Sequence, residues 1–244
     1  MIATFLIPVL FFLGALAWFF GTLVAGGAAS VLLPIIILMF GSASAAPGIA
    51  LASLMANPTR AFVFAKYINW KVIQYLLPGT VIGAALGAYG FTQLDGHYIK
   101  LLVGIFLIST IFQDKLENAG FKLISKAGWF FPLGLGVAFI SGIVGAVGPV
   151  YNPFMMSYGL YKEQLVATKA FTSFVMQAIK LITYGFMGAL SEEVLVIGVC
   201  LGLGGAVGVS YAVNHLLKMD TALFKKIMYI FMPILGAMFI YQSL

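Results

Sequence analysis

Apolar runs separated by short polar breaks follow one another along almost the whole chain. A helix rises 1.5 Å per residue, so about 20 apolar residues cross a hydrocarbon core of about 30 Å. The polar breaks divide the chain into ten apolar segments, and the pattern predicts an all-α polytopic membrane protein. We expect helices at about 3–25, 30–40, 43–66, 71–91 and 97–114 in the first half, and at about 128–147, 149–160, 163–188, 192–215 and 221–243 in the second.

The two halves repeat one pattern. The turn and short segment GGAASVLLP, from Gly26 to Pro34, line up with GAVGPVYNP, from Gly145 to Pro153, and both end on proline. The second segment of each half has only about a dozen residues, too few for a crossing, so we expect a half-helix or a strongly tilted short helix after each glycine-rich turn. The chain is therefore predicted to consist of a first membrane repeat at 1–114, a cytoplasmic linker at 115–127 and a second membrane repeat at 128–244.

The lysines predict that the two repeats have opposite orientations in the membrane. Lys66 and Lys71 flank the loop after the third segment of the first half, whereas the equivalent loop of the second half carries Glu192 and Glu193 and no lysine. The next pair of loops shows the reverse bias. Because basic residues collect on the cytoplasmic side, equivalent loops face opposite sides and both termini are predicted to lie outside. Inverted repeats with interrupted helices are typical of transporters, whose substrates bind near the membrane midplane.

Composition and charge exclude several classes of function. The 244 residues are 62% hydrophobic and 8% charged, which leaves no room for a separate water-soluble domain. The excess of basic residues is distributed between the spans as a topology signal, so a nucleic-acid partner is not expected. Cys200 is the only cysteine, which rules out an intrachain disulfide. We find no nucleophile motif, phosphate-binding loop or acidic metal motif, so we expect neither an enzyme nor a cofactor.

Three cations fall inside predicted spans, while every acidic residue lies in or beside a predicted loop. Lys169 and Lys180 are eleven residues apart, which returns to nearly the same helix face. Thr172, Ser173 and Gln177 extend a polar stripe between them on that face. An ionised lysine facing lipid costs at least about 2.5 kcal/mol, so the stripe is predicted to face the bundle interior or a wet cavity.

The matching helix of the first half has a polar face of its own, formed by Ser53, Asn57 and Arg60. Cations from both halves with no embedded acid predict a site for an anion. The alternative is that these side chains snorkel to the headgroups, since Arg60 and Lys169 lie about two turns from predicted helix ends.

The glycine-rich turns add a second element to the predicted site. Short helices that begin near Gly26 to Ser30 and near Gly145 to Asn152 would aim backbone N–H groups at a midplane anion. Small residues also let membrane helices pack closely, and packing is the interpretation we favour for the remaining glycine stripes: Gly79, Gly83 and Gly87 in the first half, and Gly204, Gly205 and Gly208 in the second.

Two stretches and the turns resemble the TauE/SafE-type sulfite exporter family. The stretches are NPTRAFVFAKYINWK (57–71) and VATKAFTSFVMQAIKLITYGFMGAL (166–190). The resemblance implies transport of sulfur-containing anions such as sulfite, thiosulfate or organosulfonates across a prokaryotic inner membrane. Many members have three consecutive glycines in each turn, and this chain departs from that pattern. The family's functional residues correspond to Arg60, Thr168, Lys169 and Lys180, with the turns near Gly27 and Gly148.

The sequence therefore predicts a secondary transporter that moves a small anion by alternating access. Arg60, Lys169 and Lys180 would supply the charge. An anion channel on the same scaffold is one alternative. A membrane assembly partner that transports nothing, and whose lysines bind lipid phosphates or another subunit, is the other. The partners expected are a small anion and the lipid bilayer, and the sequence is compatible with a homo-oligomer. The groups expected to hydrogen-bond the oxygens of the anion are Thr168, Thr172, Ser173, Asn57, Gln177 and Asn152.

Overall fold

The computed structural model describes residues 5–23, 28–118, 126–145, 150–160, 162–213, 233–234 and 236–243. The predicted all-α class is confirmed, because these residues form helices and no strand. The helices are α1 (Leu6–Leu23), α2 (Ala28–Phe40), α3 (Ser42–Val63), α4 (Trp70–Gln93), α5 (Gly96–Asn118), α6 (Phe130–Val144), α7 (Tyr151–Tyr158), α8 (Lys162–Phe186) and α9 (Glu192–Val213), with the 3-10 turns η1 (Ala65–Tyr67) and η2 (Ala127–Trp129).

Within the described ranges, five helical segments are long and apolar enough to cross a membrane: α1, α4, α6 together with η2, α8 and α9. The short second segments are present as predicted, since α2 has 13 residues and α7 has 8. One boundary differs, because α5 continues to Asn118, into the predicted linker. Its last residues, DKLEN, include good helix formers and neither glycine nor proline, so nothing local ends the helix earlier.

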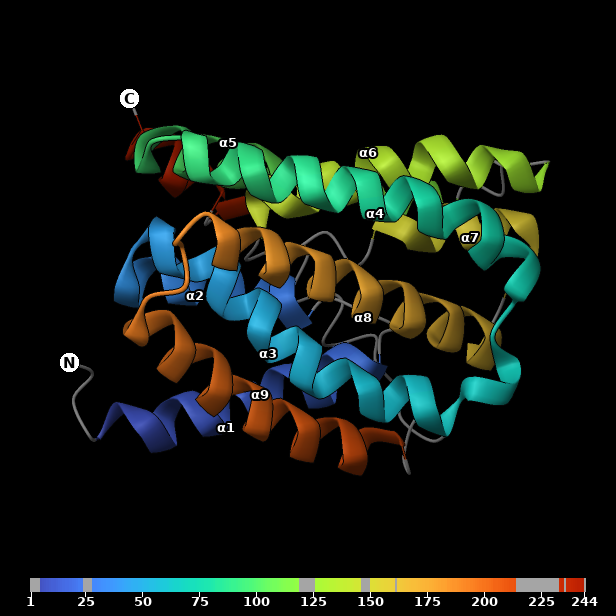
Figure 1. Ribbon diagram of the computed structural model, residues 1–244, viewed down its shortest axis with the longest axis horizontal. Helices are drawn as coiled ribbons and strands as arrows, with labels where there is room; N and C mark the ends of the chain where they lie inside the picture. The colour runs from blue at the N-terminus through green and yellow to red at the C-terminus, as the bar shows by residue number, and fades with distance from the viewer. Residues whose placement is uncertain are drawn as a thin grey trace.

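α8 lies at the centre of the bundle (Figure 1). It packs on α3 along one side and on α4 along another, while α3 also packs on α9. In Figure 1, α4, α5 and α6 form the upper layer, and α1 and α9 lie on the opposite side of the central helices. Large apolar side chains such as Phe12, Leu86 and Val207 are exposed on the outside, as expected for a surface that faces lipid.

Glycines bring two helix pairs into backbone contact. A Cβ atom on Gly79, Gly83 or Gly87 of α4 would lie 2.2 Å from a backbone oxygen of α6. On α9, a Cβ on Gly204 or Gly208 would lie 1.9 or 2.1 Å from a backbone oxygen of α1. Only glycine permits this approach, which confirms the packing role predicted for these glycine stripes.

The two pairs are equivalent in the internal repeat. α4 and α9 are the fourth segments of their halves, and α6 and α1 are the first segments of the opposite halves. Each half therefore packs its first helix against the fourth helix of the other half. Gly104 of α5 and Gly236 of the last segment also approach each other, with an added Cβ on either 2.7 Å from the oxygen of the other. These contacts agree with a two-fold pseudo-symmetry, and the opposite orientation of the repeats stays a prediction.

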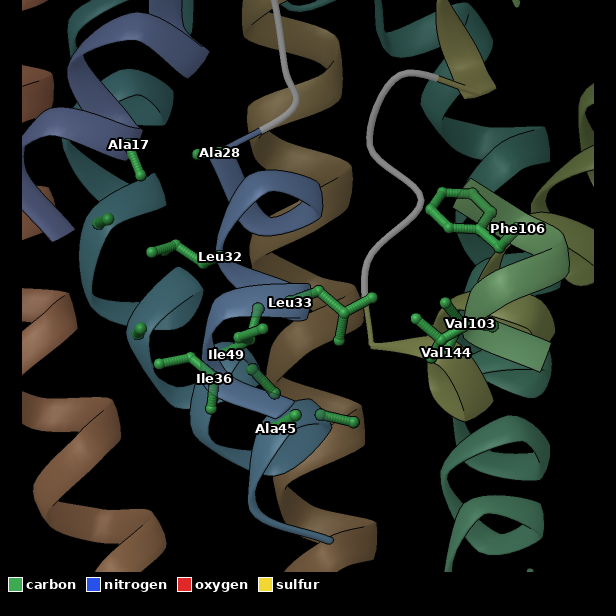
Figure 2. Packing of buried hydrophobic residues seen from close by; sticks show 14 of the residues in the cluster. Ala17, Ala28, Leu32, Leu33, Ile36, Ala45, Ile49, Val103, Phe106 and Val144 are labelled. Atoms are coloured by element: carbon green, nitrogen blue, oxygen red, sulfur yellow. The ribbon is translucent and has the colours of Figure 1, made fainter. Parts of the chain in front are cut away.

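The buried apolar core joins the short helix α2 to α3, to the middle of α5 and to the end of α6 (Figure 2). Leu33 of α2 points toward the end of α6, and its Cδ1 would lie 3.3 Å from a Cβ added to Gly145. Packing of this kind, rather than exclusion from water, holds helices together in lipid. The residues labelled in Figure 2 include Leu32, Leu33 and Ile36 on α2, Ala45 and Ile49 on α3, Val103 and Phe106 on α5, and Val144 on α6.

Candidate functional site

The polar stripe of α8 faces the protein interior. Lys180 is 0% exposed and Lys169 is 8% exposed, so both side chains lie inside the protein and not on its lipid-facing surface, which argues against the snorkelling alternative. A helix whose polar face is buried needs hydrogen-bonding partners on the surrounding helices. The other predicted residues of the stripe are also buried or half-buried: Thr168, Thr172, Ser173 and Gln177.

Lys180 contacts the end of α6. Its Nζ donates to the backbone oxygen of Gly145 at 3.1 Å and to Ser141 Oγ at 3.4 Å. α6 ends here because Gly145 adopts φ +100°, a conformation that favours glycine. A cation at this position satisfies a free carbonyl and complements the negative end of the helix dipole.

Tyr184, one turn after Lys180, extends the contact between α8 and α6. Its hydroxyl donates to the backbone oxygen of Gly142 at 2.6 Å. The last turn of α6 is thus held by two donors on one face of α8. Neither Tyr184 nor Ser141 was among the residues predicted for the site. The four-residue spacing from Lys180 to Tyr184 was the available signal, because it places both on one face.

Lys169 contacts the other side of the break between α6 and α7. Its Nζ donates a hydrogen bond to Asn152 Oδ1 at the start of α7. The two lysines therefore bracket the turn between α6 and α7 from the same helix. Residues 146–149, which include the predicted Gly148, lie outside the described residues, as does Gly27 in the corresponding turn of the first half.

α3 approaches the stripe between the two lysines. Asn57 is buried, and its Nδ2 donates to Ser173 Oγ at 2.8 Å. Ser53 lies one turn earlier on α3 and is buried as well. The backbone of Arg60 belongs to α3, while its side chain is outside the described part of the chain.

Two threonines of the stripe form hydrogen bonds with backbone groups. Thr168 Oγ1 accepts a hydrogen bond from the backbone N–H of Asn69 at 3.1 Å, which ties the start of α4 to α8. Thr172 Oγ1 donates to the backbone oxygen of Thr168 at 2.8 Å. The Thr172 proton is used within the helix, so toward an anion this side chain offers no donor in this arrangement.

Gln177 Oε1 and Ser30 Oγ are buried polar atoms with no hydrogen-bond partner among the described residues. Ser30 is 1% exposed in the first turn of α2, three residues before Leu33, so the two share a face that looks toward Gly145. A buried polar group left unpaired costs about 1–3 kcal/mol. Such atoms mark places where a ligand or water would be stabilised.

The structure thus brings eight of the predicted residues onto the interfaces of α8 with α3, α6, α7 and the start of α4. It does not bring the two lysines to one point. Eleven residues separate them by about 16 Å along the helix axis, and each has its own partner. No cluster of three or more histidine, cysteine, aspartate or glutamate side chains that could hold a metal ion occurs among the described residues.

A helical protein whose apolar segments are long enough to cross a membrane, and whose centre holds a buried cationic stripe, is an integral membrane protein. The chain belongs to the sulfite exporter TauE/SafE family, whose sequence model matches residues 10–239. Neither the curated proteins nor the solved structures gave a significant match. The family assignment confirms the resemblance and is consistent with a membrane anion transporter.

Proposed function

We propose that the protein is a secondary transporter of a small sulfur-containing anion, of the sulfite, thiosulfate or sulfoacetate type, and that it works by alternating access. The observation that carries the proposal is Lys180, a fully buried ammonium whose described acceptors are two neutral oxygens. Taking a cation out of water is costly unless an anion or several hydrogen bonds compensate. An anionic substrate supplies that compensation.

The geometry at Lys180 supports direct binding of an oxyanion. An ammonium has three N–H donors, and Ser141 and Gly145 account for two of them. Bonds from N⁺–H to a charged oxygen are about 2.7–2.9 Å long, and the contact with Ser141 Oγ is 3.4 Å. A sulfite or sulfonate oxygen would therefore bind the ammonium in preference to the serine hydroxyl.

The remaining residues would define the walls of the site. Gln177 lies one turn before Lys180, and Ser30 is buried in the first turn of α2, so their unpaired oxygens would hydrogen-bond the anion from α8 and α2. Lys169 would bind the anion at a second position, toward α7, on its way through the protein. Arg60 and the backbone N–H groups near Gly27 and Gly148 would add positive potential from both repeats.

The test is counterflow in proteoliposomes. Vesicles loaded with unlabelled sulfite are expected to accumulate labelled sulfite, because a carrier exchanges substrate from one side to the other. A channel would instead equilibrate the label without stimulation by internal sulfite. Absence of flux for sulfite, thiosulfate and sulfoacetate would contradict the proposal.

Three lysine variants assign the site. Lys169→Met and Lys180→Met each remove a charge-assisted hydrogen bond worth about 1.5–3 kcal/mol, so the apparent affinity should fall about 10- to 150-fold. Lys126→Met is the matched control, since Lys126 is exposed before α6. Unchanged affinity in both stripe variants would reject the site while leaving transport itself intact.

A further inference from the structure

We infer that the protein has a binding site for an anionic phospholipid on the outer side of α8, in an apolar groove between α3 and α8. The groove has a volume of about 240 Å³, and every described residue that lines it is apolar. Its walls come from the end of α3, the loop around η1, the first residue of α4 and the outer face of α8. An all-apolar groove that opens toward lipid fits an acyl chain.

Aromatic side chains build the groove and place it near the membrane surface. Phe62 is 81% exposed and Trp70 is 61% exposed, and both line the groove. Trp70 packs edge to face on Phe171 of α8, with ring centroids 5.4 Å apart. Exposed tryptophan at the end of a membrane span is typical of the headgroup level. The open end of the groove therefore lies where a phospholipid glycerol and headgroup would be.

Two lysines at that end supply the charge that selects the headgroup. Lys66 and Lys71 are both exposed and directly follow the groove residues Ala65 and Trp70. Lys66 Nζ lies 5.0 Å from the ring centroid of Tyr67, and neither lysine forms an ion pair within the described residues. The first acidic residue in the sequence is Asp95, beyond α4. An anionic headgroup would provide the missing counter-charge.

The groove lies directly behind the polar stripe. Phe171 and Phe174 line it, while Thr172 and Ser173, between them in the sequence, belong to the inward face of α8. The lipid would therefore contact the same helix as the substrate, from the opposite side. It needs no carboxylate, metal or second protein to complete the site.

Quenching of Trp70 fluorescence by brominated acyl chains tests the site, because bromine quenches on contact. The intact protein is reconstituted in phosphatidylcholine vesicles that contain either brominated phosphatidylglycerol or brominated phosphatidylcholine. The Trp70→Phe variant gives the signal of the other tryptophans for subtraction. Each lysine near the membrane surface raises the affinity for an anionic lipid about fivefold. Brominated phosphatidylglycerol should therefore quench Trp70 at a mole fraction up to about 30-fold lower than brominated phosphatidylcholine does.

Three variants distinguish binding in the groove from a general attraction of anionic lipid to exposed lysines. Lys66→Gln with Lys71→Gln should abolish the preference, and Ala61→Leu, which fills the groove without changing charge, should abolish it too. Lys126→Gln, at another exposed position, should keep it. Equal quenching by the two lipids in the parent protein would overturn the inference, and so would a preference that survives either groove variant. Absence of quenching would show that a second copy or another partner covers the groove, and would overturn it as well.

Discussion

Replacing Gly83 by alanine should separate α4 from α6. The added Cβ would lie 2.2 Å from the backbone oxygen of Leu135, whereas an ordinary contact begins near 3.4 Å. The obstacle is backbone, which cannot rotate away as a side chain can. The helices must therefore move apart by about 1.2 Å, and a gap of this size forfeits a quarter to a half of each nearby van der Waals contact.

The expected loss of stability follows from two opposing terms. Overpacking of this kind costs about 1–3 kcal/mol, and the better helix propensity of alanine returns about 0.5–1 kcal/mol. The net destabilisation is about 1–2 kcal/mol, which for a chain of this length lowers Tm by roughly 2–8 °C. Thermal unfolding in detergent, followed by the fluorescence of the buried Trp18, measures it.

Gly136→Ala is the matched control, because Gly136 lies on α6 next to Leu135 and a Cβ there would meet nothing within 4 Å. In the control, alanine adds only the stability that comes from its higher helix propensity, so the Tm should stay the same or rise by a few degrees. A Gly83→Ala protein that melts at or above the temperature of Gly136→Ala would refute the close approach of the two helices.

Three further changes test the other contacts. Gly204→Ala should lower Tm at least as much as Gly83→Ala, because its Cβ would lie 1.9 Å from a backbone oxygen of α1; an unchanged Tm would contradict the pairing of α1 with α9. Asn152→Asp places a carboxylate beside Lys169, so it should weaken thermal stabilisation by sulfite at least about tenfold while preserving the fold; full stabilisation would argue against a role for Lys169 in binding. Ser30→Ala removes a buried hydroxyl without a partner among the described residues, so Tm should hold or rise by a few degrees while counterflow falls; undiminished counterflow would remove Ser30 from the site.

The helices and the burial of the polar stripe were predictable from local sequence. Apolar length sets the spans, and the eleven-residue spacing from Lys169 to Lys180 sets a common face, which the structure buries. The glycine stripes were predictable for the same reason, since Gly83 and Gly87 repeat every four residues on one face of α4. Each of these properties belongs to one helix at a time.

The partners of the two lysines were not predictable. Lys180 donates to a backbone oxygen, and every residue has one, so no residue type in the sequence identifies Gly145 as the acceptor. Asn152 was predicted to bind the oxygens of the anion, and nothing in the sequence indicates that its own Oδ1 accepts a hydrogen bond from Lys169. Such pairings depend on how α6 and α7 sit against α8, which is decided by packing between segments far apart in the sequence.

The exchange of first helices between the two halves sets an order for biogenesis. α1 packs on α9, and the ribosome adds about 170 residues between the end of one and the start of the other. At about 5–20 residues per second, α1 enters the bilayer roughly ten to thirty seconds before its partner exists. During that interval, lipid or the insertion machinery covers the face of α1 that later packs against Gly204 and Gly208 of α9. A chain truncated before α9 should therefore leave α1 inserted but unassembled, and open to proteolytic quality control.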